Sequence, residues 1–197
     1  MPDNPNPQGK GQVTVLQHWE GSRPAVVLAK NERTLLTDYA ISVLILSARF
    51  QFKPVPGNTY HLYRGDDSWR LSLIAPEEWR GPGLGAYVGA CYLRTDMTWY
   101  LIPAEGLEND EALVDALDEF VVNFTASLNT GGTLEEGLPF YVPQLPFYQR
   151  LLATGLASSI SQSAAAQGLA DHSARYWLDA AGRDHLHRLP GMQPPRS

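Results

Sequence analysis

The strongest constraint on the fold is a group of four short β-type runs packed closely between residues 58 and 103. They are rich in β-branched and aromatic residues, and they read TYHLYR, SWRLSLI, AYVGACYLR and MTWYLI. The first two are joined by GDD, which supplies the Gly and Asp typical of a hairpin turn. Runs this close together favour pairing between consecutive strands, so we predict a small antiparallel four-stranded meander. Alternation along the second run predicts that Trp69, Leu71 and Leu73 share one face.

Helical patterns flank these runs on both sides. Residues 31–50 contain neither Gly nor Pro and begin with Asn31, a good N-cap, so we predict a helix there. The β-branched residues in ISVLIL leave a buried strand as the alternative. After residue 109, apolar side chains recur at helical spacing and form one stripe of Leu113, Leu117, Phe120, Val121, Phe124 and Leu128. Asn109 is the expected N-cap of that helix.

A long C-terminal helix is predicted from about Pro146 to Ala181. Its middle, ATGLASSISQSAAAQGLA, is rich in Ala, Ser and Gly. Small residues allow close approach of another helix, from this chain or from a second copy. Self-association through this helix, giving a homo-oligomer, is therefore one hypothesis.

Together these patterns predict an α+β fold in which a small antiparallel sheet packs against helices and both ends are flexible. We expect four parts: an extended N-terminal arm (1–30), an α+β domain of helix, meander and helix (31–130), a connector with the C-terminal helical segment (131–188), and a disordered tail (189–197). Within the arm, the apolar run AVVLA is expected to add an edge strand or to pack along a groove.

Charge and cysteine content restrict the class of protein. Lys and Arg number 15 against 21 Asp and Glu, giving a net charge of −6 at pH 7, and no run of basic residues offsets it. Nucleic-acid binding is therefore disfavoured. Cys91 is the only cysteine, which excludes an intrachain disulfide and fits a reducing compartment. The N-terminus has no apolar signal region, and the most apolar run, Tyr39–Phe50, is too short to cross a bilayer. We predict a soluble, cytoplasmic protein without a transmembrane segment.

Several motifs resemble a known family. They are KPVPGNTYHLY (Lys53–Tyr63), LSLIAPEEW (Leu71–Trp79) and GAYVGACYLRTDMTW (Gly85–Trp99), and together they resemble the family called domain of unknown function 2452. The opening NPNPQGKG is similar to bacterial members. The chain departs from the family pattern by a longer insertion between Trp79 and Tyr87. The resemblance implies no activity, cofactor or catalytic residue.

Candidate catalytic residues each have a structural interpretation that we prefer. Glu77 and Glu78 in APEEW are an acid pair, yet Pro at the first position followed by acids is typical of a capped helical turn. Asp96 lies between two strands, where Asp usually bonds its own backbone; facing a ligand together with Arg94 is the alternative. Cys91 in an apolar strand is usually a buried hydrophobe, and catalysis would require His61 as its base.

Two further groups of side chains raise the question of a ligand. His172, His185 and His187 lie near the C-terminus, but their spacing predicts no metal site, and we expect neither a metal nor a cofactor. The aromatic rings of the β-region are expected mostly in the core, and they are Tyr60, Tyr63, Trp69, Trp79, Tyr87, Tyr92 and Trp99. Trp79 and Tyr87, beside the Gly-rich loop, are the rings we expect to be free for binding.

The sequence leaves two functions open. One is a non-catalytic protein-interaction or self-association module, which binds a protein partner or a second copy. The other is a small-molecule-binding protein or an enzyme, with a ligand site at Tyr60, Trp79, Tyr87, Asp96 and Trp99. The position of these rings, in the core or on the surface, separates the two.

Overall fold

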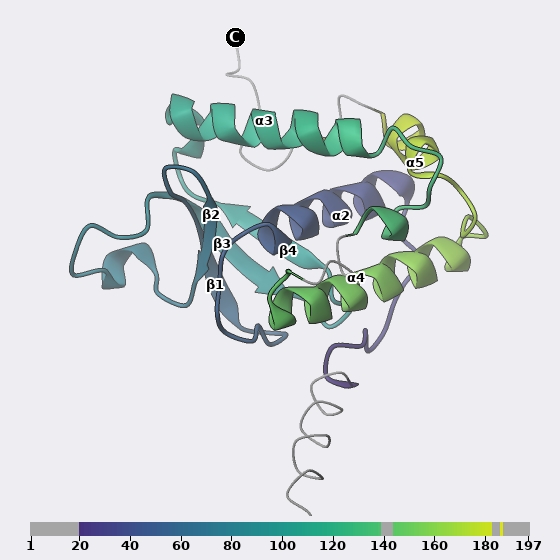
Figure 1. The fold of residues 1–197 in the computed structure, drawn as a ribbon, viewed down its shortest axis with the longest axis horizontal. Helices are drawn as coiled ribbons and strands as arrows, with labels where there is room; N and C mark the ends of the chain where they lie inside the picture. Colours follow the sequence, from purple (N-terminus) through teal and green to yellow (C-terminus); the bar gives the residue numbers. More distant parts are fainter. Residues whose placement is uncertain (1–19, 139–143, 183–185, 187–197) are drawn as a thin grey trace, which may run out of the picture.

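The protein has an α+β fold in which a four-stranded antiparallel sheet packs against helices (Figure 1). This computed structural model describes residues 20–138, 144–182 and 186. The strands are β1 (Thr59–Arg64), β2 (Trp69–Ser72), β3 (Ala86–Leu93) and β4 (Trp99–Pro103). The described helices are α2 (Glu32–Leu46), α3 (Glu111–Ser127), α4 (Phe147–Ala166) and α5 (Ala174–Ala181), with 3₁₀ turns η1 (Pro76–Glu78), η2 (Leu107–Asn109) and η3 (Glu135–Gly137).

The antiparallel sheet is confirmed, but its strand order is β2-β1-β3-β4 and differs from a simple meander. β1 is central because the chain leaves β2 through a long loop (73–85) and returns on the other side of β1, where Thr59 pairs with Tyr92. The prediction for Leu73 was also wrong. Trp69 and Leu71 are buried, whereas Leu73 is 57 % exposed because β2 ends at Ser72.

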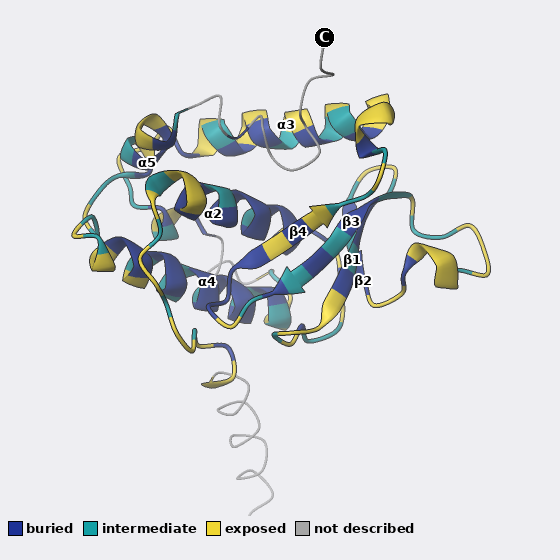
Figure 2. Cartoon of the chain, turned by 180° about the vertical axis from the view of Figure 1, so that it is seen from behind, coloured by how far each residue is buried: buried dark blue, intermediate teal, exposed yellow. Residues whose placement is uncertain are grey.

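Helix α2 forms as predicted and lies at the centre of the molecule. Asn31 is its N-cap, and the Asn31 Oδ1 atom accepts a hydrogen bond of 2.9 Å from the Thr34 amide. The helix contacts β4, α3, α4 and α5, so most of its side chains are buried (Figure 2). Burial on nearly all sides explains the β-branched, continuously apolar sequence, which resembled a buried strand.

The long C-terminal helix was predicted wrongly, because the chain forms two helices, α4 and α5. Gly168 adopts a positive φ of 73°, and the Leu169 amide bonds the Ala164 carbonyl at 2.9 Å. This left-handed residue ends α4, a conformation that Gly adopts without steric cost. Ser173 then caps α5.

The small residues of α4 accommodate the N-terminal arm. A Cβ added to Gly155 would overlap the carbonyl of Ser22. Further along the helix, the Ser163 hydroxyl donates to the Leu28 carbonyl at 2.9 Å. The sequence predicted close approach of another helix. Helix α4 does contact α2, but the element that approaches at Gly155 and Ser163 is the extended segment of the same chain.

Helix α3 presents the predicted apolar stripe, with one shift at its start. Its N-cap is Asp110, which accepts the Leu113 amide at 3.0 Å, whereas Asn109 ends the 3₁₀ turn before it. The buried stripe residues are Leu113, Leu117, Val121, Phe124 and Leu128, while Phe120 is partly buried.

None of the described helices combines the length and hydrophobicity that a membrane span requires. The expected tail (189–197), the first 19 residues of the arm, and His185 and His187 lie outside the described residues.

Candidate functional site

The two faces of the sheet have very different surroundings. The inner face carries buried side chains, among them Tyr60, Leu62, Cys91, Trp99 and Leu101. Tyr60 and Trp99 are each only 1 % exposed, and their rings meet edge to face at 5.6 Å. These two predicted ligand-binding residues are therefore part of the hydrophobic core.

The outer face is open over β3 and β4. The register places Tyr92 opposite Tyr100 and Ala90 opposite Ile102. Tyr100 is 41 % exposed and Ile102 is 46 % exposed, although their chain neighbours Trp99 and Leu101 are buried. Figure 2 colours parts of β4 as exposed, and no helix is drawn in front of β3 and β4 in that view. Half-exposed apolar side chains thus occupy a sheet face that usually carries polar residues.

An aromatic cluster covers the other end of the outer face. The Trp79 indole N–H donates to the Tyr63 hydroxyl at 3.1 Å, and this hydroxyl donates to the Ile74 carbonyl at 2.8 Å. The Tyr87 ring lies 5.3 Å from that of Tyr63, and the Tyr87 hydroxyl lies 3.2 Å from Nδ1 of His61. The structure therefore brings Trp79 and Tyr87 onto the same ring, and the 73–85 loop contacts this end of the sheet through Ile74 and Trp79.

Burial disfavours the charged forms of the tyrosine and histidine side chains in this cluster. It raises the pKa of Tyr87 to about 12 and also raises the pKa of Tyr63. Burial lowers the pKa of His61, an effect that the negative charges of Glu77 and Glu78 oppose. At neutral pH the two phenols remain protonated, so the cluster offers hydrogen bonds and ring surfaces rather than charge.

The glutamates of APEEW form the capped turn that the sequence predicts. Pro76 begins η1, and the Glu78 carboxylate accepts the Ala75 amide at 2.8 Å. Glu77 is exposed. One member of the acid pair thus has a structural partner, and the two do not form a catalytic dyad.

Asp96 belongs to a buried network of charges at the turn between β3 and β4. Its Oδ1 accepts the Thr98 amide at 3.0 Å, which is the backbone bond expected for Asp in a turn. The Lys30 ammonium lies 2.7 Å from both Asp96 and Asp38, and Arg94 lies 2.9 Å from Asp38. Burial disfavours the charge, but the hydrogen bonds from Lys30 and Thr98 outweigh it and hold the pKa of Asp96 below its usual range. The network ties the arm to α2 and to the sheet.

Cys91 and His61 do not meet. Cys91 pairs with Tyr60, whereas His61 pairs with Ala90, so alternation places the two side chains on opposite faces. Cys91 is fully buried, and burial raises the pKa of its thiol. Neither feature suits a nucleophile.

The described residues contain no group of three or more His, Cys, Asp or Glu side chains that could hold a metal ion. The ring of His172 lies 4.1 Å from that of Tyr176 in an edge-to-face contact.

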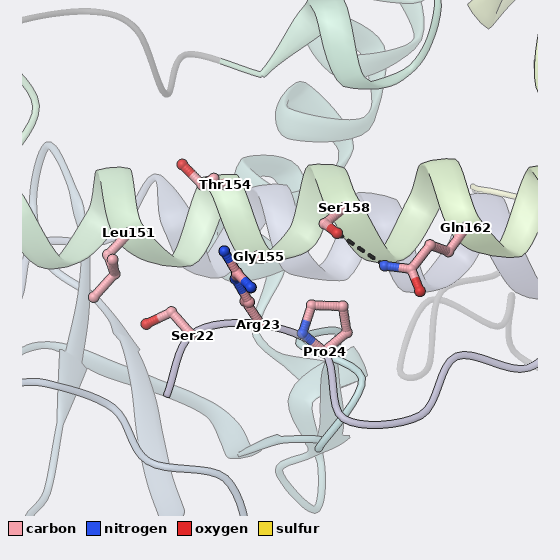
Figure 3. A pocket seen from close by; sticks show the side chains of 8 residues that line it. All are labelled: Ser22, Arg23, Pro24, Leu151, Thr154, Gly155, Ser158 and Gln162. Carbon is pink, nitrogen blue, oxygen red and sulfur yellow. Dashed lines mark hydrogen bonds between the residues drawn. The ribbon is translucent and has the colours of Figure 1, made fainter. Parts of the chain in front are cut away.

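Two hollows border the N-terminal arm. One, of about 440 Å³, lies between the arm and α4, and Figure 3 shows its lining: Ser22, Arg23, Pro24, Leu151, Thr154, Gly155, Ser158 and Gln162. The Gln162 amide donates to the Ser158 hydroxyl within it at 2.9 Å. The other, of about 540 Å³, lies between the arm and the end of β3, and its lining includes Val26, Leu28, Tyr92, Arg94 and Asp96. Of the five predicted ligand-binding residues, only Asp96 lines either hollow.

The sequence did not indicate the lining of these hollows or the exposure of Tyr100 and Ile102. The hollows depend on the arm meeting elements far away in the chain, for which the signals were the small residues of α4 and the apolar run AVVLA. That run adds no edge strand, and its residues Val26 and Leu28 line the second hollow. The exposure of β4 depends on which phase of its alternation faces the helices, and its sequence, WYLIP, is apolar in both phases.

Comparison with protein families gives a match over half of the chain. The sequence model of the family described as Protein of unknown function (DUF2452) matches residues 25–123, which include the charged network, the whole sheet and most of α3. This match confirms the resemblance seen in the sequence. No solved structure matches the chain.

Proposed function

We propose that this chain, which belongs to the family described as Protein of unknown function (DUF2452), is a non-catalytic protein-interaction module. Its binding surface is the open part of the outer sheet face, formed by Tyr92, Tyr100, Ile102 and Arg94; we call it the β3–β4 patch. The observation that carries the proposal is the exposure of Tyr100 and Ile102, 41 % and 46 %, on a rigid strand whose other side is core.

The shape of the β3–β4 patch suits a protein partner. Cross-strand pairing fixes Tyr92 beside Tyr100, so a ligand meets a preformed surface. The patch continues across the hollow at Tyr92 to Val26 and Leu28, which are 65 % and 69 % exposed. Neighbouring exposed apolar side chains of this kind mark interaction sites.

Charge indicates what kind of partner fits. The four strands contain no Asp or Glu, although the whole chain carries a net charge of −6. Arg94 leaves 38 % of its side chain exposed and stacks its guanidinium 4.9 Å from the centre of the Tyr100 ring. Arg70 adds a second cation on the outer face, opposite Tyr63. An extended segment that combines acidic with aromatic or aliphatic residues would complement this surface.

The polar groups considered for catalysis have structural partners, which supports a binding role. Asp96 is held by Lys30 and Thr98, Glu78 caps η1, and Cys91 is buried away from His61. A catalytic role for any of these groups would have to be compatible with its structural role.

Selection from a random peptide library displayed on phage tests the proposal. We expect enrichment of peptides that contain Asp or Glu together with aromatic or aliphatic residues. Ile102→Glu should weaken a selected peptide at least tenfold, because it places a buried charge in the contact. The matched control is Val122→Glu, because Val122 is also an apolar residue, is 57 % exposed and lies on helix α3 instead of the sheet.

Peptides that bind the Ile102→Glu variant as tightly as the unaltered protein would contradict the proposal. Light scattering could instead show a dimer that Ile102→Glu dissociates and Val122→Glu preserves. This result would identify a second copy of the chain as the occupant of the patch, and would overturn the proposal that an acidic partner segment binds there.

A second candidate function is small-molecule binding, favoured by the hollow of about 540 Å³ between the arm and β3. Its walls are apolar at Val26 and Leu28, with Arg94 and Asp96 for polar contacts. Native mass spectrometry of the purified protein tests it: a retained mass that is lost on denaturation supports a ligand, and a bare protein mass opposes it.

We also propose that the protein acts in the cytoplasm. The support is its cysteine content, since the single Cys91 is buried and suits a reducing compartment. Fractionation of the source cells tests the location.

A further inference from the structure

Arg94 is the most exposed member of the charged network at the turn between β3 and β4. The network pairs two cations with two carboxylates, so its charges balance. Its other members are sheltered: the side chains of Asp38, Asp96 and Lys30 are 7 %, 12 % and 14 % exposed. The side chain of Arg94 is 38 % exposed. A network that is neutral as a whole therefore presents a positive group to the β3–β4 patch.

Two contacts fix the position of the Arg94 guanidinium. One of its nitrogens, Nη1, donates to the Asp38 carboxylate at 2.9 Å and lies 3.5 Å from the Thr98 hydroxyl. Its central carbon lies over the Tyr100 ring, 4.9 Å from the ring centre. Because a carboxylate and an aromatic face already hold the group, binding a ligand costs it little further side-chain entropy.

The other two nitrogens of this guanidinium, Nε and Nη2, make no hydrogen bond with the described residues. They lie on one edge of the planar group, and the N–H groups of that edge match the two oxygens of a carboxylate. Asp38 is bonded to Nη1 and does not use this edge. Two parallel hydrogen bonds between ionised groups are stronger than bonds between neutral groups, so the edge is suited to bind a carboxylate.

Arg70 is a second cation on the outer face, and it lies too far from β4 to replace Arg94. It is on β2, opposite Tyr63 of β1. The strand order puts β2 three strand spacings from β4, about 14 Å. An acidic side chain that lies beside Tyr100 is therefore expected to meet Arg94.

We propose that Arg94 is the specificity-determining residue of the β3–β4 patch. Its Nε and Nη2 bind the side-chain carboxylate of an Asp or Glu in the partner segment, and neighbouring apolar residues of that segment contact Tyr92 and Ile102. This inference rests on the proposed function, since it assigns one group of the partner to one group of the patch. Charge complementarity supports it, because the strands of the patch contain no Asp or Glu.

Pairs of peptides test the role of Arg94. Each acidic peptide from the phage selection is compared with analogues in which one Asp or Glu at a time is replaced by Asn or Gln. With the unaltered protein, one such replacement should weaken binding about tenfold or more in fluorescence anisotropy, because it removes a charge-assisted bidentate contact. With Arg94→Gln the same replacement should weaken binding less than about twofold, since the carboxylate has already lost its partner.

Two further variants separate this contact from a general effect of charge. Arg94→Lys keeps the charge but lacks the planar fork, so the preference for the acidic peptide should fall to an intermediate value. It also keeps a cation beside Asp38, and therefore tests the contact even where Arg94→Gln does not fold. Arg70→Gln removes a cation from the same sheet face, and should leave the preference unchanged.

The outcomes distinguish a failure of this inference from a failure of the patch. Peptides that depend on Ile102 but keep their acidic preference with Arg94→Gln would reject the role of Arg94 and leave the patch in place. A preference that disappears with Arg70→Gln, and persists with Arg94→Gln, would also overturn the inference by placing the carboxylate at the other end of the face. Peptides that bind Ile102→Glu without loss would reject the patch itself, and the role of Arg94 with it.

Discussion

Trp99 and Tyr100 are adjacent in the chain, and comparing them separates the two faces of the sheet. Trp99 is 1 % exposed and packs against Tyr60, whereas Tyr100 is 41 % exposed and contacts Arg94. Both are large aromatic residues on the same strand. The comparison teaches that a high density of rings does not identify a binding surface; the face on which each ring lies decides its role.

The largest expected difference between the faces is in stability. Trp99→Ala should lower the free energy of unfolding by about 3–5 kcal/mol, since it removes a fully buried ring and leaves a cavity. Tyr100→Ala should change it by about 0.5 kcal/mol or less, as at most surface positions. Urea denaturation of both variants measures the two values. Equal losses would mean that the outer face is covered in solution, and the contrast between the faces would then fail.

Gly89 tests how closely β3 and β4 must approach each other. A Cβ at this position would overlap the Ile102 carbonyl on β4. Gly89→Ala should therefore cost about 2–3 kcal/mol, because the strands must separate. Ala90 is the next residue in the chain and lies on the outer face, so Ala90→Ser should cost about 0.5 kcal/mol or less. A silent Gly89→Ala in thermal and urea unfolding would show that β4 moves freely relative to β3.

Trp79 tests the end of the outer face that the 73–85 loop contacts. Trp79→Ala should cost about 2 kcal/mol, roughly half the loss for a fully buried ring, since Trp79 is half-buried against Tyr63. Trypsin should then cleave faster after Arg80, because the loop loses its anchor. Trp79→Phe keeps a ring but loses the indole N–H, so it should lie between the two. Unchanged cleavage would indicate that other contacts hold the loop.

Local sequence patterns predicted most helices and strands, but they did not predict how these elements pack against one another. Asn31 indicated the start of α2, and Pro76 with Glu78 indicated η1, because helix caps depend only on neighbouring residues. The place of β3 beside β1 was missed, since it depends on the path of the 73–85 loop. Gly168 does carry a stop signal, but its Ala-rich surroundings made one long helix equally consistent with the sequence.

The candidate site was predictable only in part, for the same reason. Trp79 and Tyr87 flank a Gly-rich loop, and that position indicated rings near the surface. Tyr60 and Trp99 were assigned to a ligand although both are core, because period-two alternation defines two faces without saying which one the helices cover. The partners of Asp96 include Lys30, 66 residues away, and no local pattern reports such a contact.

The smallest expected effect concerns the charged network, which connects the two faces. Arg94 stacks on Tyr100 at the outer face and bonds Asp38 of α2, while Lys30 joins Asp38 to Asp96. Asp96→Asn should cost about 1.5 kcal/mol at pH 7, through the weakened bond to the Lys30 ammonium. The amide can still accept the Thr98 amide, so the turn itself should persist.

The pH dependence identifies this loss as electrostatic. The folded pKa of Asp96 lies below the ordinary value of 3.8, so its contribution is fully present above that pH and is lost as the pH falls through the folded pKa. Urea unfolding between pH 7 and pH 2 should therefore show the stability gap between the unaltered protein and Asp96→Asn closing in acid. A gap that persists at pH 2 would mean that the variant disturbs packing instead. The two faces would then be joined by the shape of the turn rather than by its charges.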